Sequence, residues 1–331
     1  MKMFIKLIPG FLFRLLSFMC IMMICLPAMT QDFNSAVKLY ESGKYDEAFK
    51  IFSSVKKGTP QYAECRYKMG MISMHKRLLS DAEDYFGQAV AANDKIASYH
   101  IAMVSLYGQI ITDANPLRQA ILAPKIKSHL EAAALIDPAN LGVRVMLLGF
   151  YIRAPRIMGG DIEKAKKTAD DIMKIDRAEG NRALGMVAQF EEKPADAERF
   201  FRTALLLTPD SVKHYTQLAS FFQLASRYDE ALDIYEKAVV KFPKNRNMLY
   251  QAGRVAAMSG TKNGEKGKKY LSAFIEQVPD KSNRNLANAY YFLGVIEKDR
   301  KNTSAALGYF NAALKINPNH RQSKEAIDAM K

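Results

Sequence analysis

The sequence predicts an all-α solenoid, in which antiparallel helical hairpins stack one after another along the chain. The first observation is a repeat with a spacing of 34 residues, in which Ala197, Phe201, Ala204 and Pro209 recur as Ala231, Tyr235, Ala238 and Pro243. The second is the same spacing nearer the N-terminus, where Ala48 and Phe52 recur as Ala82 and Phe86. A fixed period of this length is typical of stacked helical hairpins. The composition, 49% hydrophobic and 25% charged, is that of a folded chain.

Residues 1–30 have the pattern of a signal peptide. Basic residues, Lys2, Lys6 and Arg14, precede the apolar run 15–27, and small residues follow it. Cleavage there would leave a mature chain that begins near Gln31. The pattern and the composition predict an exported bacterial protein, periplasmic or secreted. The alternative is that the segment stays attached as an N-terminal membrane anchor.

Cysteine use after the predicted leader predicts a fold without an internal disulfide. Cys20 and Cys25 lie within the leader, which leaves Cys65 alone in residues 31–331. Cys65 falls on a predicted helix, between Tyr62 and Met69. We therefore expect a buried small side chain and not a reactive thiol.

The first four hairpins begin regularly and then depart from the period. Residues 33–55 form the first hairpin, with Gly43 suited to a left-handed helix end. The second follows with Gly70, Ala82 and Phe86. The region 108–161 is irregular: we expect about ten extra residues between the helices of the third hairpin, a kink or break at Pro124, and a longer loop in the fourth. Asp161 is a candidate N-cap for the helix that follows.

The last four hairpins and the C-terminal tail complete the predicted solenoid. Residues 181–209 and 215–243 are the most regular hairpins. The seventh has Gly253 and then a glycine- and lysine-rich run, 260–269, which we expect to be an exposed, flexible basic loop. The eighth extends to Pro318, and the polar tail 321–331 is expected to be a capping helix.

These residues resemble tetratricopeptide repeats. The resemblance rests on the pairs Leu184-Gly185, Leu218-Ala219 and Leu293-Gly294, on alanine, aromatic and alanine residues at three- and four-residue steps in each second helix, and on the closing proline. It implies a right-handed superhelix of about eight hairpins, over residues 31–331, with a C-terminal capping helix. Packing agrees independently, because helices approach closely only where small residues such as Gly185 and Gly294 lie at the crossing.

No motif for chemistry accompanies the repeats. The five histidines lack the spacing of a metal site, and no Gly-x-Ser-x-Gly elbow is present. The run 260–267 lacks the Gly-Lys-Ser/Thr ending of a phosphate-binding loop. We therefore predict no catalytic, cofactor-binding or metal site, and a protein that is not an enzyme.

The resemblance places a partner-binding surface on the inner face of the first helices. The side chains that would form it are Tyr67, Met71, Arg182, Met186, Gln189, Tyr250, Arg254, Tyr291 and Lys298. Aromatic residues and arginine are enriched at protein interfaces. Some members of the family bind a partner's C-terminal carboxylate with lysine and asparagine, but the matching positions here are Phe33, Val37, Tyr67 and Met71. Binding of that kind is not predicted.

Three functions follow from these patterns. The leading one is a non-enzymatic scaffold or adapter in the cell envelope that binds a peptide or partner protein in the concave groove. The net charge of +14 and the lysines Lys262, Lys266, Lys268 and Lys269 favour the alternative, an envelope assembly factor on an anionic membrane or polymer. The third is an enzyme with a site in the irregular region, formed by Arg153, Arg156 and Asp161. No arginine-rich run indicates a nucleic-acid partner.

Overall fold

The computed structural model describes residues 32–279 and 284–330, which include no β-strand. The predicted leader and Lys331 lie outside the described residues. A first helical segment covers residues 32–41. The further α-helices are α2 Tyr45–Ser54, α3 Tyr62–His75, α4 Leu79–Ala92, α5 Ala97–Thr112, α6 Pro116–Ile136, α7 Leu141–Arg153, α8 Ile162–Ile175, α9 Arg177–Phe190, α10 Pro194–Leu207, α11 Val212–Leu224, α12 Tyr228–Lys241, α13 Arg246–Met258, α14 Gly264–Gln277, α15 Arg284–Asp299, α16 Thr303–Ile316 and α17 Arg321–Asp328. Short 3₁₀ helices are η1 Arg156–Met158 and η2 Thr261–Asn263.

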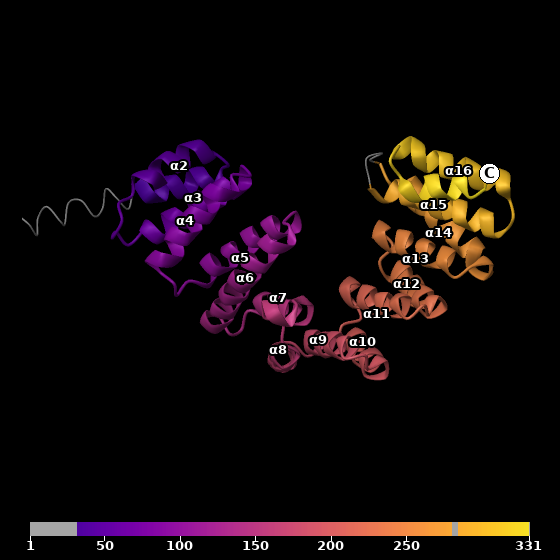
Figure 1. Ribbon diagram of the computed structural model, residues 1–331, viewed down its shortest axis with the longest axis horizontal. Helices are drawn as coiled ribbons and strands as arrows, with labels where there is room; N and C mark the ends of the chain where they lie inside the picture. Colours follow the sequence, from indigo (N-terminus) through magenta and orange to yellow (C-terminus); the bar gives the residue numbers. More distant parts are fainter. Residues whose placement is uncertain (1–31, 280–283, 331) are drawn as a thin grey trace, which may run out of the picture. The chain divides into compact units, whose positions relative to one another are not determined.

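The chain divides into two compact units, Met1–Ala165 and Lys166–Lys331. Within unit 1, α3 packs against α4 and α5 against α6; within unit 2, the pairs are α9 with α10, α11 with α12, α13 with α14 and α15 with α16. Figure 1 shows these pairs as antiparallel helices joined by short turns. The structure confirms the predicted all-α repeat of helical hairpins, whereas the right-handed superhelix remains a prediction.

Three hairpins, α3–α4, α9–α10 and α15–α16, are closed by a glycine on the first helix and a phenylalanine on the second. A Cβ atom built on Gly185 would lie 2.5 Å from Cε1 of Phe201, and one on Gly294 would lie 2.4 Å from Cε1 of Phe310. Gly70 has the same relation to Phe86, at 2.4 Å from Cδ1. Real side chains do not approach so closely, so only glycine allows the ring to rest on the helix backbone.

The aromatic and alanine residues of the repeat form the core, as predicted. Phe201, Tyr235 and Phe310 are at most 1% exposed. The alanines before and after each ring, such as Ala231 and Ala238, are completely buried. Cys65 is also buried on α3, and burial raises the pKa of its thiol to about 12, which makes it a poor nucleophile.

The turn inside every hairpin except α5–α6 contains one residue in the left-handed region. Gly43 has φ 77°, as its position predicted. In later hairpins Arg77, Glu192, Ser226 and Lys301 have φ between 56° and 61°. Side chains are rarely tolerated there, so the packed hairpin, and not local preference, holds these four turns.

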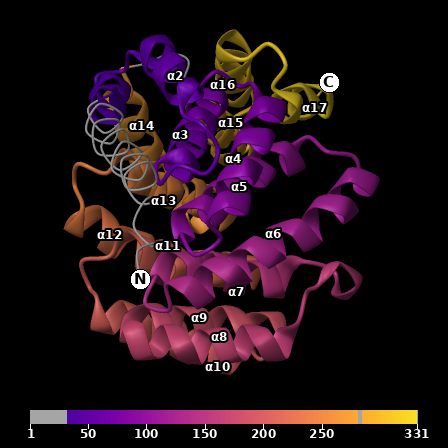
Figure 2. The ribbon, with the colours of Figure 1, turned by 90° about the vertical axis from the view of Figure 1, so that its left-hand side faces the viewer.

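The irregular region differs from its prediction in the third hairpin, whereas the prediction for Asp161, described below, is confirmed. The extra residues of the third hairpin do not form a loop, because only residues 113–115 separate α5 from α6. They lengthen α6 instead, a 21-residue helix that contains Pro124 without ending there. The Asn115 side chain caps this helix by accepting a hydrogen bond from the Arg118 N–H, 2.9 Å away. Figure 2 shows α6 as a long helix beside α5 and α7.

Asp161 is the N-cap of α8, as predicted. Its Oδ1 accepts hydrogen bonds from the backbone N–H groups of Glu163 and Lys164, at 3.0 and 3.1 Å. The cap stabilises the start of the helix after the long connection that follows α7.

The predicted flexible loop at 260–269 is wrong. Residues 261–263 form η2, and α14 begins at Gly264, so most of the run is helical. Two of its glycines allow close packing against α15: a Cβ atom would lie 3.2 Å from Cγ2 of Ile296 at Gly264 and 2.7 Å from Cδ1 of Ile296 at Gly267. None of the described helices combines the length and apolar composition needed to cross a bilayer.

Candidate binding surface

The nine predicted binding residues all lie on first helices, but they differ in exposure. They come from α3, α9, α13 and α15. Lys298 is exposed, whereas Arg182 and Tyr250 are each only 6% exposed. The expectation that these two side chains face a partner directly is therefore corrected: both pack inside unit 2. The remaining six are partly buried: Tyr67, Met71, Met186, Gln189, Arg254 and Tyr291.

The predicted aromatic residues pack within their own hairpins and against the element that follows. The ring centroid of Tyr67 lies 6.0 Å from that of Phe86 and 5.1 Å from that of Tyr99, and Met71 packs in the same cluster as Phe86. Tyr291 lies 5.8 Å from Phe310 and 5.5 Å from His320. Burial raises the pKa of both tyrosines. Their packing stabilises the solenoid, and their role toward a partner stays a prediction.

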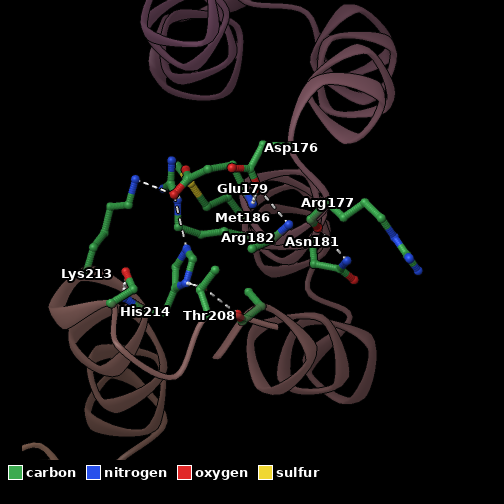
Figure 3. Close-up of polar contacts among 12 residues, drawn as sticks. Asp176, Arg177, Glu179, Asn181, Arg182, Met186, Thr208, Lys213 and His214 are labelled. Atoms are coloured by element: carbon green, nitrogen blue, oxygen red, sulfur yellow. Dashed lines mark hydrogen bonds and ion pairs between the residues drawn. The ribbon is translucent and has the colours of Figure 1, made fainter. Parts of the chain in front are cut away.

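Arg182 belongs to a buried charged cluster that sequence reasoning did not find (Figure 3). Its Nε donates to Oε2 of Glu179 at 2.8 Å, and its Nη1 lies 3.1 Å from the sulfur of Met186. Lys213 and His214 reach Oε1 of the same carboxylate from α11, His214 through Nε2 at 3.1 Å. Glu179 on α9 and His214 on α11 are 35 residues apart, which is about one repeat. The cluster therefore joins the first helices of consecutive hairpins.

The cluster keeps Glu179 ionised. Burial alone would raise the pKa of this carboxyl group, but the hydrogen bonds from His214 and Lys213 and the charge of Arg182 hold its pKa well below the usual range. Glu179 and Arg182 are both buried, so their pairing avoids an isolated charge in the interior. The carboxylate and guanidinium thus neutralise each other inside the protein.

Thr208, His214 and Glu179 form a hydrogen-bonded series that resembles a catalytic triad. Oγ1 of Thr208 lies 2.5 Å from Nδ1 of His214, whose Nε2 reaches Glu179. However, His214 is only 2% exposed, and the Thr208 hydroxyl also bonds the Ala204 carbonyl at 3.1 Å. A substrate would have to displace the α10–α11 connection to reach the imidazole. The geometry therefore favours a structural role for this series.

Arg254 occupies a different environment from Arg182. Its Nε donates to Oε1 of Gln251 at 3.1 Å, and its Nη2 donates to Oε1 of Gln223 on α11. Gln223 in turn donates to the Tyr235 hydroxyl at 3.1 Å. Both acceptors are neutral amides, and within the described part of the chain no carboxylate pairs with this guanidinium. Arg254 is thus an oriented, partly exposed cation whose charge the protein leaves uncompensated.

The lysines of α14 and η2 are largely neutralised, contrary to the picture of a basic loop. Lys262 pairs with Asp229 at 2.8 Å, Lys266 with Glu236 at 2.9 Å, and Lys268 with Glu297 at 2.7 Å. The acids come from α12 and α15, so these pairs link neighbouring hairpins. The positive patch that the sequence suggested is therefore much weaker in the folded unit.

The irregular region contains an apolar pocket, but not the predicted set of polar residues. Arg153 lines it, whereas Arg156 and Asp161 do not. Asp161 is occupied with capping α8. No group of three or more potential metal ligands occurs in the described residues, although His100 and His129 lie together with their Nδ1 atoms 2.9 Å apart.

Comparisons with known proteins agree with this architecture. Two family models described as tetratricopeptide repeat match residues 182–260 and 287–320. A crystal structure of a tetratricopeptide repeat protein from Parabacteroides merdae aligns with 92% of this chain and 99% of that chain, at 13% identity and a TM-score of 0.56. Yeast Tom70 aligns with 86% of this chain and 58% of that chain, at 16% identity and a TM-score of 0.59.

A curated relative matches over a shorter segment. Cell division cycle protein 27 homolog B of Arabidopsis thaliana is 28% identical over 135 residues, 41% of this chain. The match spans only 17% of that protein's length. The fold and its repeated contacts define a helical-repeat scaffold of the kind used for protein interactions. Residues 182–260 and 287–320 are tetratricopeptide repeats, and the fold of the chain is that of tetratricopeptide repeat proteins.

Proposed function

We propose that this protein is an exported, non-enzymatic scaffold that binds an acidic segment of a partner protein on the first helices of unit 2. The observation that carries the proposal is the environment of Arg254. A guanidinium group has five N–H donors. Two of them bond the glutamine oxygens described above, so the others remain to bind a carboxylate of the partner.

Arg254 is already oriented before a partner arrives. Gln251 and Gln223 hold the guanidinium from two helices, so little conformational entropy is lost on binding. A charge-assisted hydrogen bond to a carboxylate is about twice as strong as a neutral one. Binding of an acidic peptide would therefore break no existing ion pair, because the present acceptors, Gln251 and Gln223, are neutral.

The other predicted residues of unit 2 are assigned different roles in this proposal. Met186, Gln189 and Lys298 retain exposed surface and would contact the partner beside Arg254. Arg182 and Tyr250 would not touch the partner but would support the binding surface from inside unit 2. Arg182 bonds Glu179 on α9, and Tyr250 packs on Phe274 with ring centroids 5.3 Å apart. Replacing either would disturb folding before it disturbed binding.

The test is crosslinking and affinity capture from the native cell envelope, with Arg254→Gln compared with wild type. Arg246→Gln is the matched control, because Arg246 is an exposed arginine on the same helix. We expect Arg254→Gln to keep the circular dichroism spectrum and to lose the captured partner, whereas Arg246→Gln keeps both. Equal capture by all three proteins would refute the assignment of Arg254.

Export is the second part of the proposal and is supported by the leader-like residues 1–30. Fractionation of the source cells, with the mass of the intact protein, tests it. A periplasmic or secreted chain that begins near Gln31 is the expected result. A full-length chain released from membranes only by detergent would establish the anchored alternative.

The alternative of an assembly factor on an anionic membrane or polymer gains no support from the folded unit. Three of the four lysines that suggested it are in ion pairs. The fourth, Lys269, is exposed and pairs with no described carboxylate; its ammonium lies 5.7 Å from the centre of the Tyr270 ring. Salt-sensitive binding to anionic vesicles would be the result that favours this alternative over the scaffold.

A further inference from the structure

Unit 1 contains an apolar pocket of about 440 Å³ where the repeat is irregular. It lies between α5, α6, α7 and the residues that follow α7. Its walls include Val104, Ile126, Leu130, Met146, Phe150 and Met158. This volume is within the range of small-molecule sites, about 300–1,000 Å³.

One edge of the pocket carries positive charge. Arg153 is an exposed lining residue whose Nε donates to the Gly149 carbonyl at 3.2 Å. A Cβ atom on Gly149 would lie 2.6 Å from Nη2 of Arg153, so the missing side chain lets the guanidinium lie against the wall of the pocket. No aspartate or glutamate is among the lining residues, and no described carboxylate pairs with Arg153.

Further cationic and apolar groups lie next to this edge. Nζ of Lys127 is 3.4 Å from the position of a Cβ atom on Gly159, immediately after η1. Arg156 is exposed on η1, and the neighbouring Ile157 is 92% exposed. The surroundings of the pocket therefore combine a cationic rim with an exposed aliphatic side chain, which matches a ligand with one anionic end and an otherwise apolar body.

We propose that this pocket binds a fatty acid, with the acyl chain against the apolar walls and the carboxylate on Arg153. A buried peptide segment fits less well, because its amide groups would need hydrogen-bond partners. The polar side chains of the lining are Gln119 and Arg153, and each already uses a donor internally: Gln119 Nε2 bonds the Ala114 carbonyl at 2.9 Å. An acyl chain has no such need. This proposal is independent of partner binding by unit 2.

The test is isothermal titration calorimetry of the full chain with dodecanoate below its micelle concentration. Dodecylamine, which has the same chain and a cationic head, is the comparison ligand. We expect dodecanoate to bind and dodecylamine to bind at least about tenfold more weakly, because Arg153 would repel an ammonium group. Arg153→Gln should weaken dodecanoate binding by about tenfold or more.

Two further variants separate the pocket from the rest of the surface. Met146→Glu puts a charge on the pocket wall and should abolish binding, whereas Met258→Glu in unit 2 should not; the two methionines are 39% and 40% exposed. A photoreactive fatty acid should label peptides of α7 and η1, and dodecanoate should compete. Label concentrated in unit 2, or equal binding of the two ligands, would overturn the proposal. The proposal would also be overturned if the protein bound an acidic apolar peptide but not dodecanoate. That result would assign the pocket to a protein partner.

Discussion

Arg182 and Arg254 make the same contact to chemically different partners. Each donates from Nε to the residue three positions earlier on its own helix, at 2.8 Å to Glu179 and at 3.1 Å to Gln251. The first contact is a buried ion pair, whereas in the second no carboxylate of the described residues pairs with the guanidinium. Arg182, beside a carboxylate, therefore stabilises the fold, whereas Arg254, beside an amide, is available to bind a partner.

Gln251→Glu should therefore abolish partner binding without removing any arginine. The new carboxylate would neutralise Arg254 within the protein, as Glu179 neutralises Arg182. We expect an unchanged circular dichroism spectrum and loss of the partner captured by wild type. Gln251→Ala is the matched control, which removes one amide contact but leaves the charge available. Capture that persists in Gln251→Glu would contradict the role given to the guanidinium.

Glu179→Gln should destabilise unit 2 by about 3 kcal/mol, since it leaves a buried guanidinium without its counter-charge. Urea denaturation measures the loss, and hydrogen exchange should show it first in α9 and α11, because solenoids open locally. Glu276→Gln, on an exposed position of α14, should stay within about 0.5 kcal/mol of wild type. Equal stability of the two variants would show that the cluster contributes little.

His129 should make unit 1 sensitive to mild acid. Burial, together with the nearby His100 and Lys125, lowers the pKa of His129 from 6.5 to about 4. Between these two values the unfolded chain binds a proton that the folded chain does not, so stability falls as the pH decreases from 6.5 toward 4. His129→Gln should reduce this slope in thermal melts recorded across that range, whereas His75→Gln, on an exposed position, should not.

Two glycines of the last hairpin should respond oppositely to alanine. At Gly294 the new methyl would collide with Phe310, so Gly294→Ala should cost about 1–3 kcal/mol of stability. At Gly308, in α16, nothing lies within 4 Å of the Cβ position, so Gly308→Ala should add about 0.5–1 kcal/mol. Chemical denaturation compares the two, and a stabilised Gly294→Ala would show that the ring can move aside.

Pro124→Ala should stabilise α6. Proline inside a helix removes one backbone hydrogen bond and crowds the preceding turn, at about 3 kcal/mol relative to alanine. Alanine also increases the freedom of the unfolded chain, which offsets up to about 1 kcal/mol. We therefore expect a net gain of about 1–3 kcal/mol in the free energy of unfolding of unit 1. A loss would mean that the proline itself is required for packing against α5 and α7.

The predictions from periodicity succeeded where one contact recurs at a fixed spacing. Gly185 and Gly294 were predicted to lie at helix crossings, and the structure places the buried rings of Phe201 and Phe310 against them. The prediction failed at 260–269 because the glycines in this run have a low helix propensity. Packing of Gly267 beneath Ile296 overrides that local preference and makes the segment helical.

By itself, the sequence determined the hairpins, their small-residue crossings and their aromatic core, because these depend on residues close along the chain and on a period that repeats. The tertiary structure decided which charges are neutralised and which remain. Lys266 reaches Glu236 and His214 reaches Glu179 across 30 and 35 residues, through side chains from different helices. Such partners depend on the stacking of whole hairpins, and so does the pocket beside Arg153, which exists only where α5, α6 and α7 meet.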